Sequence, residues 1–120
     1  MSRVRVVEKE MKIEDKIFLA LNLEMKNADL VFLSEGETQL GTLAVAIPEA
    51  QEMVGLPISS VFLGDRNVAL ARVLAEQLSQ KTKKIALVSV FSRTLNEREA
   101  GSIFMKLLKK SAETGEDPKK

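Results

Sequence analysis

Serine side chains are the candidate nucleophiles of this 120-residue sequence, and Ser59, Ser60, Ser89 and Ser92 lie in or beside strand-like segments. A nucleophilic serine needs a neighbouring base, most often His. The chain contains no His and no Cys, which excludes a Ser-His-Asp triad, thiol chemistry and metal sites built on imidazole or thiolate. A Ser-Lys pair is the arrangement left open, but Ser59 and Ser60 fit a strand and its edge better. We therefore expect no catalytic residues.

Carboxylates offer two other kinds of chemistry, acid-base catalysis and metal binding. Glu8 and Glu10 share one face of a predicted strand, and Glu35 and Glu37 lie beside a predicted turn. An acid-base pair needs burial that these segments do not indicate, since exposed strand and turn carboxylates are ordinarily solvated. Asp29, Glu35 and Glu37 also lack the spacing of a known cation-binding loop. We expect neither a metal nor another cofactor.

Lysines form two clusters that could contact a phosphate backbone. These clusters are Lys81, Lys83 and Lys84, where a predicted helix meets a strand, and Lys106, Lys109, Lys110, Lys119 and Lys120. Lysines at helix C-termini are expected from the helix dipole alone, and the chain has no Tyr or Trp to stack on bases. Nucleic acid is therefore an unfavoured partner.

The overall charge gives no indication of a charged partner, because 18 Lys and Arg residues balance 17 Asp and Glu residues. No apolar run approaches the roughly 20 residues that a membrane-spanning helix needs. Residues 1–5 lead directly into alternating charges, unlike a signal peptide. We expect a cytoplasmic protein without membrane contact.

Residues 57–84 carry the most specific local pattern, which predicts a strand, a tight turn and a helix. Gly64 can adopt the positive φ that a sharp exit from a strand often needs, and Asp65 can cap the first turn of the helix. Phosphate-binding loops share this layout, but a single glycine without Gly-Lys-Ser/Thr argues against one. We expect Gly64, Asp65, Arg66 and Asn67 to form a structural junction that also contacts a partner protein.

Alternation of apolar and polar residues predicts six strands. They are expected over 4–13 and 16–26, as a hairpin with a turn at 14–15; over 30–33 and 40–47, as a second hairpin with Gly36 in its turn; and over 58–63 and 84–91. Residues 48–57 read as a short helix or an ordered loop.

Apolar residues at helical spacing predict two long helices. The first begins at Val68 and places Leu70, Val73, Leu74 and Leu78 on one face. The second begins at Thr94, with Glu97 in the capping-box position, and places on one face Ala100, Ile103, Phe104, Leu107 and Leu108.

This order predicts an α+β fold, in which an antiparallel five- to six-stranded sheet carries two main helices on one face. Two such helices cover roughly one face of the sheet. The other face would be apolar too, with Leu19 and Leu21 on one strand and Leu43 and Val45 on another. Since soluble monomers rarely expose so large an apolar surface, we expect this face to form a dimer.

One domain is expected over residues 1–112. Residues 113–120 have nothing to bury, and we expect them to form a disordered tail.

Residues of roughly 28–110 resemble the small proteasome assembly chaperones of the third and fourth types. The resemblance rests on the order and character of the strand Leu40-Gly-Thr-Leu-Ala-Val-Ala46, the segment Pro57-Ile-Ser-Ser-Val-Phe-Leu-Gly-Asp65 and the helix containing Leu74-Ala-Glu-Gln-Leu78. Its most specific part is the Leu63-Gly64-Asp65 turn. Residues 1–27 match only as a pair of strands.

The resemblance implies a non-catalytic chaperone that binds proteasome α-subunits during assembly of the α-ring, as a homodimer or as a heterodimer with a related chain. Larger assembly chaperones dock into α-ring pockets by a C-terminal hydrophobic-Tyr-X tail. This sequence has no Tyr and finishes with Asp117-Pro-Lys-Lys120, so we do not expect docking of that kind. The absence of Cys and the many Lys and Glu residues suit an archaeal or thermophilic source.

Two other functions stay open. One is a small dimeric nucleic-acid-binding protein of the chromatin type, which would use the lysine clusters, and the other is a generic dimeric adaptor for another complex. An enzyme ranks last.

Overall fold

A computed structural model describes residues 4–48, 58–64 and 66–114 of the chain. Its strands and helices are, in chain order, β1 (Arg5–Ile13), β2 (Lys16–Glu24), β3 (Ala28–Glu35), β4 (Thr42–Ile47), β5 (Ile58–Leu63), α1 (Val68–Thr82), β6 (Ile85–Phe91) and α2 (Glu97–Thr114). The predicted short helix or ordered loop at 48–57 lies outside the described residues except for Pro48. Among the described residues, no helix has the length and apolar character needed to cross a membrane.

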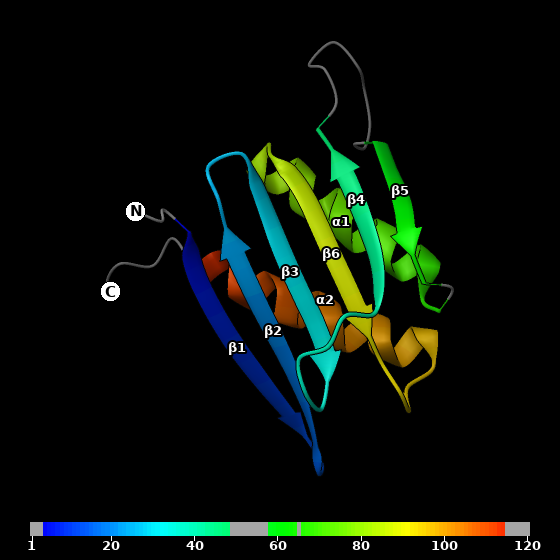
Figure 1. The fold of residues 1–120 in the computed structure, drawn as a ribbon. Helices are drawn as coiled ribbons and strands as arrows, with labels where there is room; N and C mark the ends of the chain where they lie inside the picture. Colours follow the sequence, from blue (N-terminus) through cyan, green and yellow to red (C-terminus); the bar gives the residue numbers. More distant parts are fainter. Residues whose placement is uncertain (1–3, 49–57, 65, 115–120) are drawn as a thin grey trace.

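The six strands form one sheet in the order β1-β2-β3-β6-β4-β5 (Figure 1). β3 and β6 pair in parallel, and the other neighbours pair antiparallel. The α+β class is confirmed, but the prediction of an antiparallel sheet is wrong because the sheet is mixed. The predicted hairpin of β3 with β4 is also wrong, since β6 lies between them.

The composition of β6 explains its central place. Ala86, Val88 and Val90 on one side of the strand are buried, and Ser89 on the other side is buried as well. A strand that is apolar on both sides over nearly its whole length suits the middle of a sheet, beside a parallel neighbour. The connection from β3 therefore passes the end of β6 before it enters β4.

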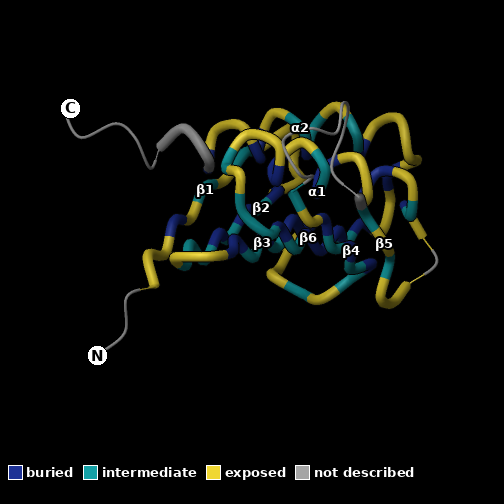
Figure 2. Tube along the Cα trace, turned by 90° about the horizontal axis from the view of Figure 1, so that it is seen from above, coloured by how far each residue is buried: buried dark blue, intermediate teal, exposed yellow. Residues whose placement is uncertain are grey.

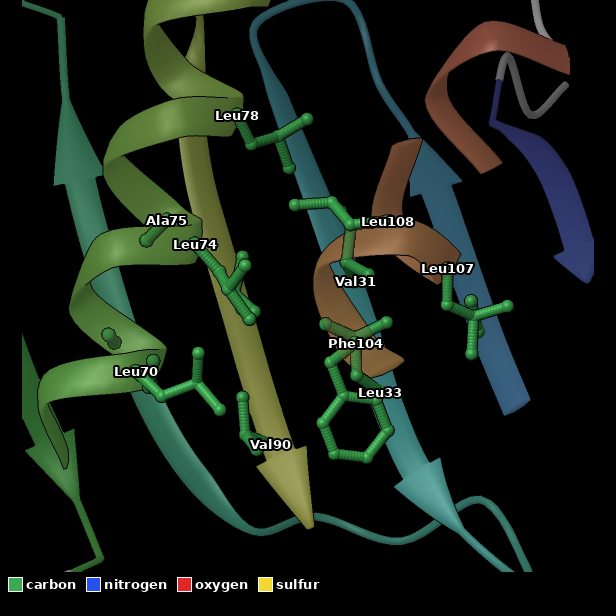
Figure 3. Packing of buried hydrophobic residues seen from close by; sticks show 14 of the residues in the cluster. Val31, Leu33, Leu70, Leu74, Ala75, Leu78, Val90, Phe104, Leu107 and Leu108 are labelled. Atoms are coloured by element: carbon green, nitrogen blue, oxygen red, sulfur yellow. The ribbon is translucent and has the colours of Figure 1, made fainter. Parts of the chain in front are cut away.

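The two helices lie on the same face of the sheet, as predicted (Figure 2). α1 contacts β4, β5 and β6, and α2 contacts β1, β2 and β3. Between helices and sheet lies the core, where Leu74 of α1 and Phe104 and Leu107 of α2 meet Val31 and Leu33 of β3 (Figure 3). The ring of Phe104 also meets Phe18 of β2 edge to face, with the ring centroids 6.1 Å apart.

The helices differ from prediction in three details. Val73 is 41% exposed, so the buried side of α1 consists instead of Leu70, Ala71, Leu74, Ala75, Leu78 and Ser79. α2 begins at Glu97 rather than at Thr94, because the capping box is formed by Asn96 and Glu99, each of which accepts a hydrogen bond from the other's amide. α2 extends to Thr114 and so includes the first two residues of the predicted tail, and residues 115–120 lie outside the described part.

Candidate functional site

One face of the sheet has no helix on it in the described part of the chain (Figure 2). On β2, Phe18, Ala20 and Asn22 face the helices and are buried. The alternate residues, Leu19 and Leu21, therefore face the other way and are half-buried. The more polar side of β2 is the one that the helices cover, and its fully apolar side is left open.

The open apolar face, as we name this surface, is continuous across four strands. One row of paired apolar residues crosses it from β2 to β4 through Leu23, Leu30, Leu87 and Val45. The next row places Leu21, Phe32 and Leu43 on the same face, but its β6 position is Ser89, which is polar and fully buried. Leu19, Leu21, Leu43 and Val45, the residues predicted for a dimer contact, thus share this face, with β3 and β6 between the two pairs. A surface of this kind is typical of a protein interface.

A second surface lies where β3, β5 and β6 end and β4 begins, at the lower edge of the sheet in Figure 1. The backbones approach closely here. A Cβ atom on Gly41 would lie within 2.8 Å of the Phe91 Cα atom, and one on Gly64 would lie 2.6 Å from Thr42 Cα. Glycine is therefore required at both positions to let β4 pass its neighbours.

Glu35 fixes the loop between β6 and α2 at this edge. Its carboxylate accepts hydrogen bonds from the Arg93 amide at 2.8 Å, the Thr94 amide at 3.1 Å and Thr94 Oγ1 at 2.5 Å. Burial by itself raises the pKa of Glu35, but these hydrogen bonds and the charge of Lys16 together hold the pKa below its ordinary value. The expectation that Glu35 is a solvated turn carboxylate is wrong, because the side chain is only 8% exposed.

The predicted partner-binding loop connects β5 to α1. Gly64 has φ +97°, as its place at the strand exit predicts. The N-cap residue is Asn67, in a left-handed conformation and without a side-chain capping bond, so the prediction that Asp65 takes the cap position is wrong. The Asp65 side chain lies outside the described residues. The Arg66 carbonyl accepts a hydrogen bond from Thr42 Oγ1, and Arg66 Nη2 donates to the Arg93 carbonyl at 3.2 Å, which ties this loop to β4 and to the loop after β6.

The start of β4, the loop from β5 to α1 and the end of β6 border a hollow of about 360 Å³, which we name the Arg66–Arg93 hollow. Its lining comprises Leu40, Gly41 and Thr42 from the start of β4, Leu63, Gly64, Arg66 and Asn67 from the end of β5, and Val90, Phe91, Ser92 and Arg93 from the end of β6. Three of the four predicted loop residues, Gly64, Arg66 and Asn67, therefore border a concave site.

Polar groups in the hollow include two without a protein partner among the described residues. Asn67 Nδ2 and Ser92 Oγ are buried and make no hydrogen bond there. Arg66 and Arg93 are exposed at the same site, and the Arg93 guanidinium lies 5.9 Å from the centre of the Phe91 ring. The site presents donors and positive charge, and none of the lining residues that the structure describes is acidic.

Neither Arg93 nor Ser92 stood out in the sequence as a partner of the Gly64 loop, since 26 to 29 positions separate Arg66 and Gly64 from them. The sequence does carry one indication of this contact. Residues 92–96 follow a strand that is apolar on both sides, and segments that follow parallel or alternate strands lie at the same edge of a sheet.

Two of the candidate serines, Ser59 and Ser89, have structural partners. Ser59 Oγ bonds to Glu76 and to Arg72, which joins β5 to α1, and Ser89 Oγ accepts the Gly41 amide at 2.8 Å. Within the described segments, no group of three or more acidic residues is arranged to hold a metal ion.

Part of the first lysine cluster also has a structural role. Lys84 Nζ lies 3.0 Å from Asp29 Oδ1 and donates to the Met25 carbonyl at 2.8 Å. The Asp29 side chain is buried, so this lysine serves the fold by pairing a buried charge.

The fold is similar to that of a solved chaperone structure. A chain in the crystal structure of a chaperone complex for yeast 20S proteasome assembly superposes with a TM-score of 0.69, over 96% of this chain and 97% of that chain, at 12% sequence identity. The likeness shows that the two chains share a fold. No protein-family model matches the sequence, and no curated protein matches it either.

Proposed function

We propose that this protein is a non-catalytic assembly chaperone that binds proteasome α-subunits and promotes assembly of the α-ring and core particle. The observation that carries the proposal is the likeness to a chain of the yeast 20S proteasome assembly chaperone complex, which spans nearly all of both chains. The resemblance of the Leu63-Gly64-Asp65 turn and its flanking segments to the same class of chaperone supports it from the sequence side.

The open apolar face suits a dimer contact. It presents Leu19, Leu21, Leu43 and Val45 without a helix over them in the described residues, and burying such a surface against a second copy is the simplest way to remove it from water. A heterodimer with a related chain would use the same face. A cytoplasmic location and an archaeal source stay predictions.

The loop containing Gly64, Arg66 and Asn67 suits a contact with the client subunit. It lies at the strand-end edge and is held by bonds to β4 and to the loop after β6, so its polar side chains are presented from a fixed frame. Binding from such a frame would favour one arrangement of subunits over others without any covalent chemistry.

Affinity capture from the native source tests the proposal. The tagged protein should recover proteasome α-subunits as its main partners, without nucleic acid. Recovery of nucleic acid that is lost at high salt would favour the chromatin-type alternative, because counterion release makes such binding strongly salt-dependent. Recovery of an unrelated complex would favour the adaptor.

A further inference from the structure

We propose that the Arg66–Arg93 hollow is a carboxylate-binding site that receives an Asp or Glu side chain of the client subunit. The hollow and its ligand chemistry follow from the residues that line it. The identity of the client rests on the proposed function.

Two buried donors point to a ligand in the hollow. Asn67 is 9% exposed and Ser92 is 6% exposed, yet Asn67 Nδ2 and Ser92 Oγ have no hydrogen-bond partner among the described protein residues. Buried polar groups are nearly always paired, and each unpaired one needs an explanation. The two come from different loops and line the same hollow, so one acceptor placed there could pair with both.

Two guanidinium groups supply charge for an anion. Arg66 uses Nη2 in its bond to the Arg93 carbonyl, and a guanidinium has five N–H donors in all, so both side chains keep donors for a ligand. The flat fork of these donors matches the two oxygens of a carboxylate. Among the described residues, Glu35 is an acid close to Arg93, and it is already engaged by the amides of Arg93 and Thr94.

The lining favours a carboxylate over a phosphate. Phosphate sites typically offer several free backbone amides in succession, but the Gly41 amide is bonded to Ser89 Oγ. The remaining walls include the apolar side chains of Leu40, Leu63, Val90 and Phe91. Such walls suit the methylene groups that carry a carboxylate on an acidic side chain.

The position of the hollow favours a protein as the source of the carboxylate. Phe91 lines the hollow and also lies on the side of β6 that belongs to the open apolar face, since it alternates with Leu87 and Ser89. A protein that covers the border of that face would also contact the hollow, without a conformational change. The strand-end edge stays at the periphery when two sheet faces pack together, which leaves it available to a client.

An NMR titration of the full chain tests the site without the client. The probe is N-acetylglutamate α-amide, which carries one side-chain carboxylate, and its matched control is N-acetylglutamine amide. We expect saturable shifts of the Asn67 side-chain amide and of the Arg66 and Arg93 backbone amides with the glutamate probe only. No saturable shift, equal shifts with the glutamine control, or tighter binding of inorganic phosphate would overturn the assignment.

A capture experiment with purified α-subunits tests the use of the site. The double variant Arg66→Gln/Arg93→Gln should bind roughly tenfold or more weakly than wild type, as expected for loss of hydrogen bonds to a charged group. Arg98→Gln, at an exposed arginine in the first turn of α2, is the matched control and should bind like wild type. Equal capture by all three proteins would overturn the role of the hollow. Failure of wild type to capture α-subunits would refute the proposed client, and the NMR result would still report on the hollow.

Discussion

Glu35 ties the end of β3 to the loop before α2, and its ionisation should therefore affect stability. A carboxyl whose pKa is lower in the folded state contributes stability that is fully present above its unfolded pKa, about 4.3 for Glu. That contribution is lost as the pH falls through the folded pKa. Glu35→Gln should lower the free energy of unfolding by about 1.5 to 3 kcal/mol at pH 7, and the difference from wild type should shrink towards about pH 3.

Urea titrations at several pH values measure this difference. Glu37→Gln is the matched control, because Glu37 is an exposed acid in the turn that follows Glu35. Its effect should stay within about 0.5 kcal/mol. A Glu35→Gln effect that is the same at neutral and acid pH would show that the carboxylate charge does not hold this loop.

Gly64 and Gly36 allow a second comparison at the level of single residues. Both have positive φ, +97° and +92°, so alanine is strained at either position by about 1 to 2 kcal/mol. Only Gly64 lies against the Thr42 backbone, whereas a Cβ on Gly36 would meet nothing within 4 Å. Gly64→Ala should therefore destabilise the protein by about 1 to 3 kcal/mol more than Gly36→Ala in thermal or urea unfolding. Equal losses of stability in the two variants would mean that the β4 backbone shifts at Thr42 without an energetic cost.

At the scale of elements, α1 depends on one buried row of side chains. Leu74 is fully buried against the sheet (Figure 3), and Leu74→Ala should cost about 2 to 5 kcal/mol through lost contacts and the cavity left behind. Val73→Ala, one residue away on the exposed side, should change stability by less than about 0.5 kcal/mol. A loss below half a kcal/mol for Leu74→Ala in urea titration would show that the row is not a buried contact.

Most elements were predictable because their patterns are local. Alternation in β2 separates Leu19 and Leu21 from Phe18 and Ala20, and the structure places the two pairs on opposite faces. The helix caps at Asn67 and Asn96 were misplaced because Asp65 and Thr94 nearby are equally good capping residues. The choice among neighbouring capping residues depends on the residue at which the preceding strand ends, and tertiary packing determines that residue.

Pairing of β3 with β6 was not predictable from turn signals. Gly36 indicated a turn after β3, and a hairpin is the shortest way to use a turn. Burial favours the observed pairing of β3 with β6 instead. β6 has apolar residues on both sides, so it buries most apolar surface at the centre of the sheet. The same rearrangement brings Ser92 and Arg93 beside Arg66, so the hollow was not predictable without the strand order.

At the scale of the whole molecule, the open apolar face predicts a dimer. Val45→Glu places a charge on that face and should give a monomer at micromolar concentration in light scattering, whereas wild type should be a dimer. Val73→Glu, on the outer side of α1, introduces the same charge away from the face and should leave the dimer intact. A monodisperse monomer for the wild-type protein would contradict the proposed dimer.

The most direct test of the central claim is the assembly of purified α-subunits into rings, followed by native mass spectrometry with and without this protein. The protein should form a complex with α-subunits before rings appear, should raise the rate or yield of complete rings, and should be absent from the mature particle. Unchanged assembly, with no complex between this protein and α-subunits at any stage, would contradict a role as an assembly chaperone.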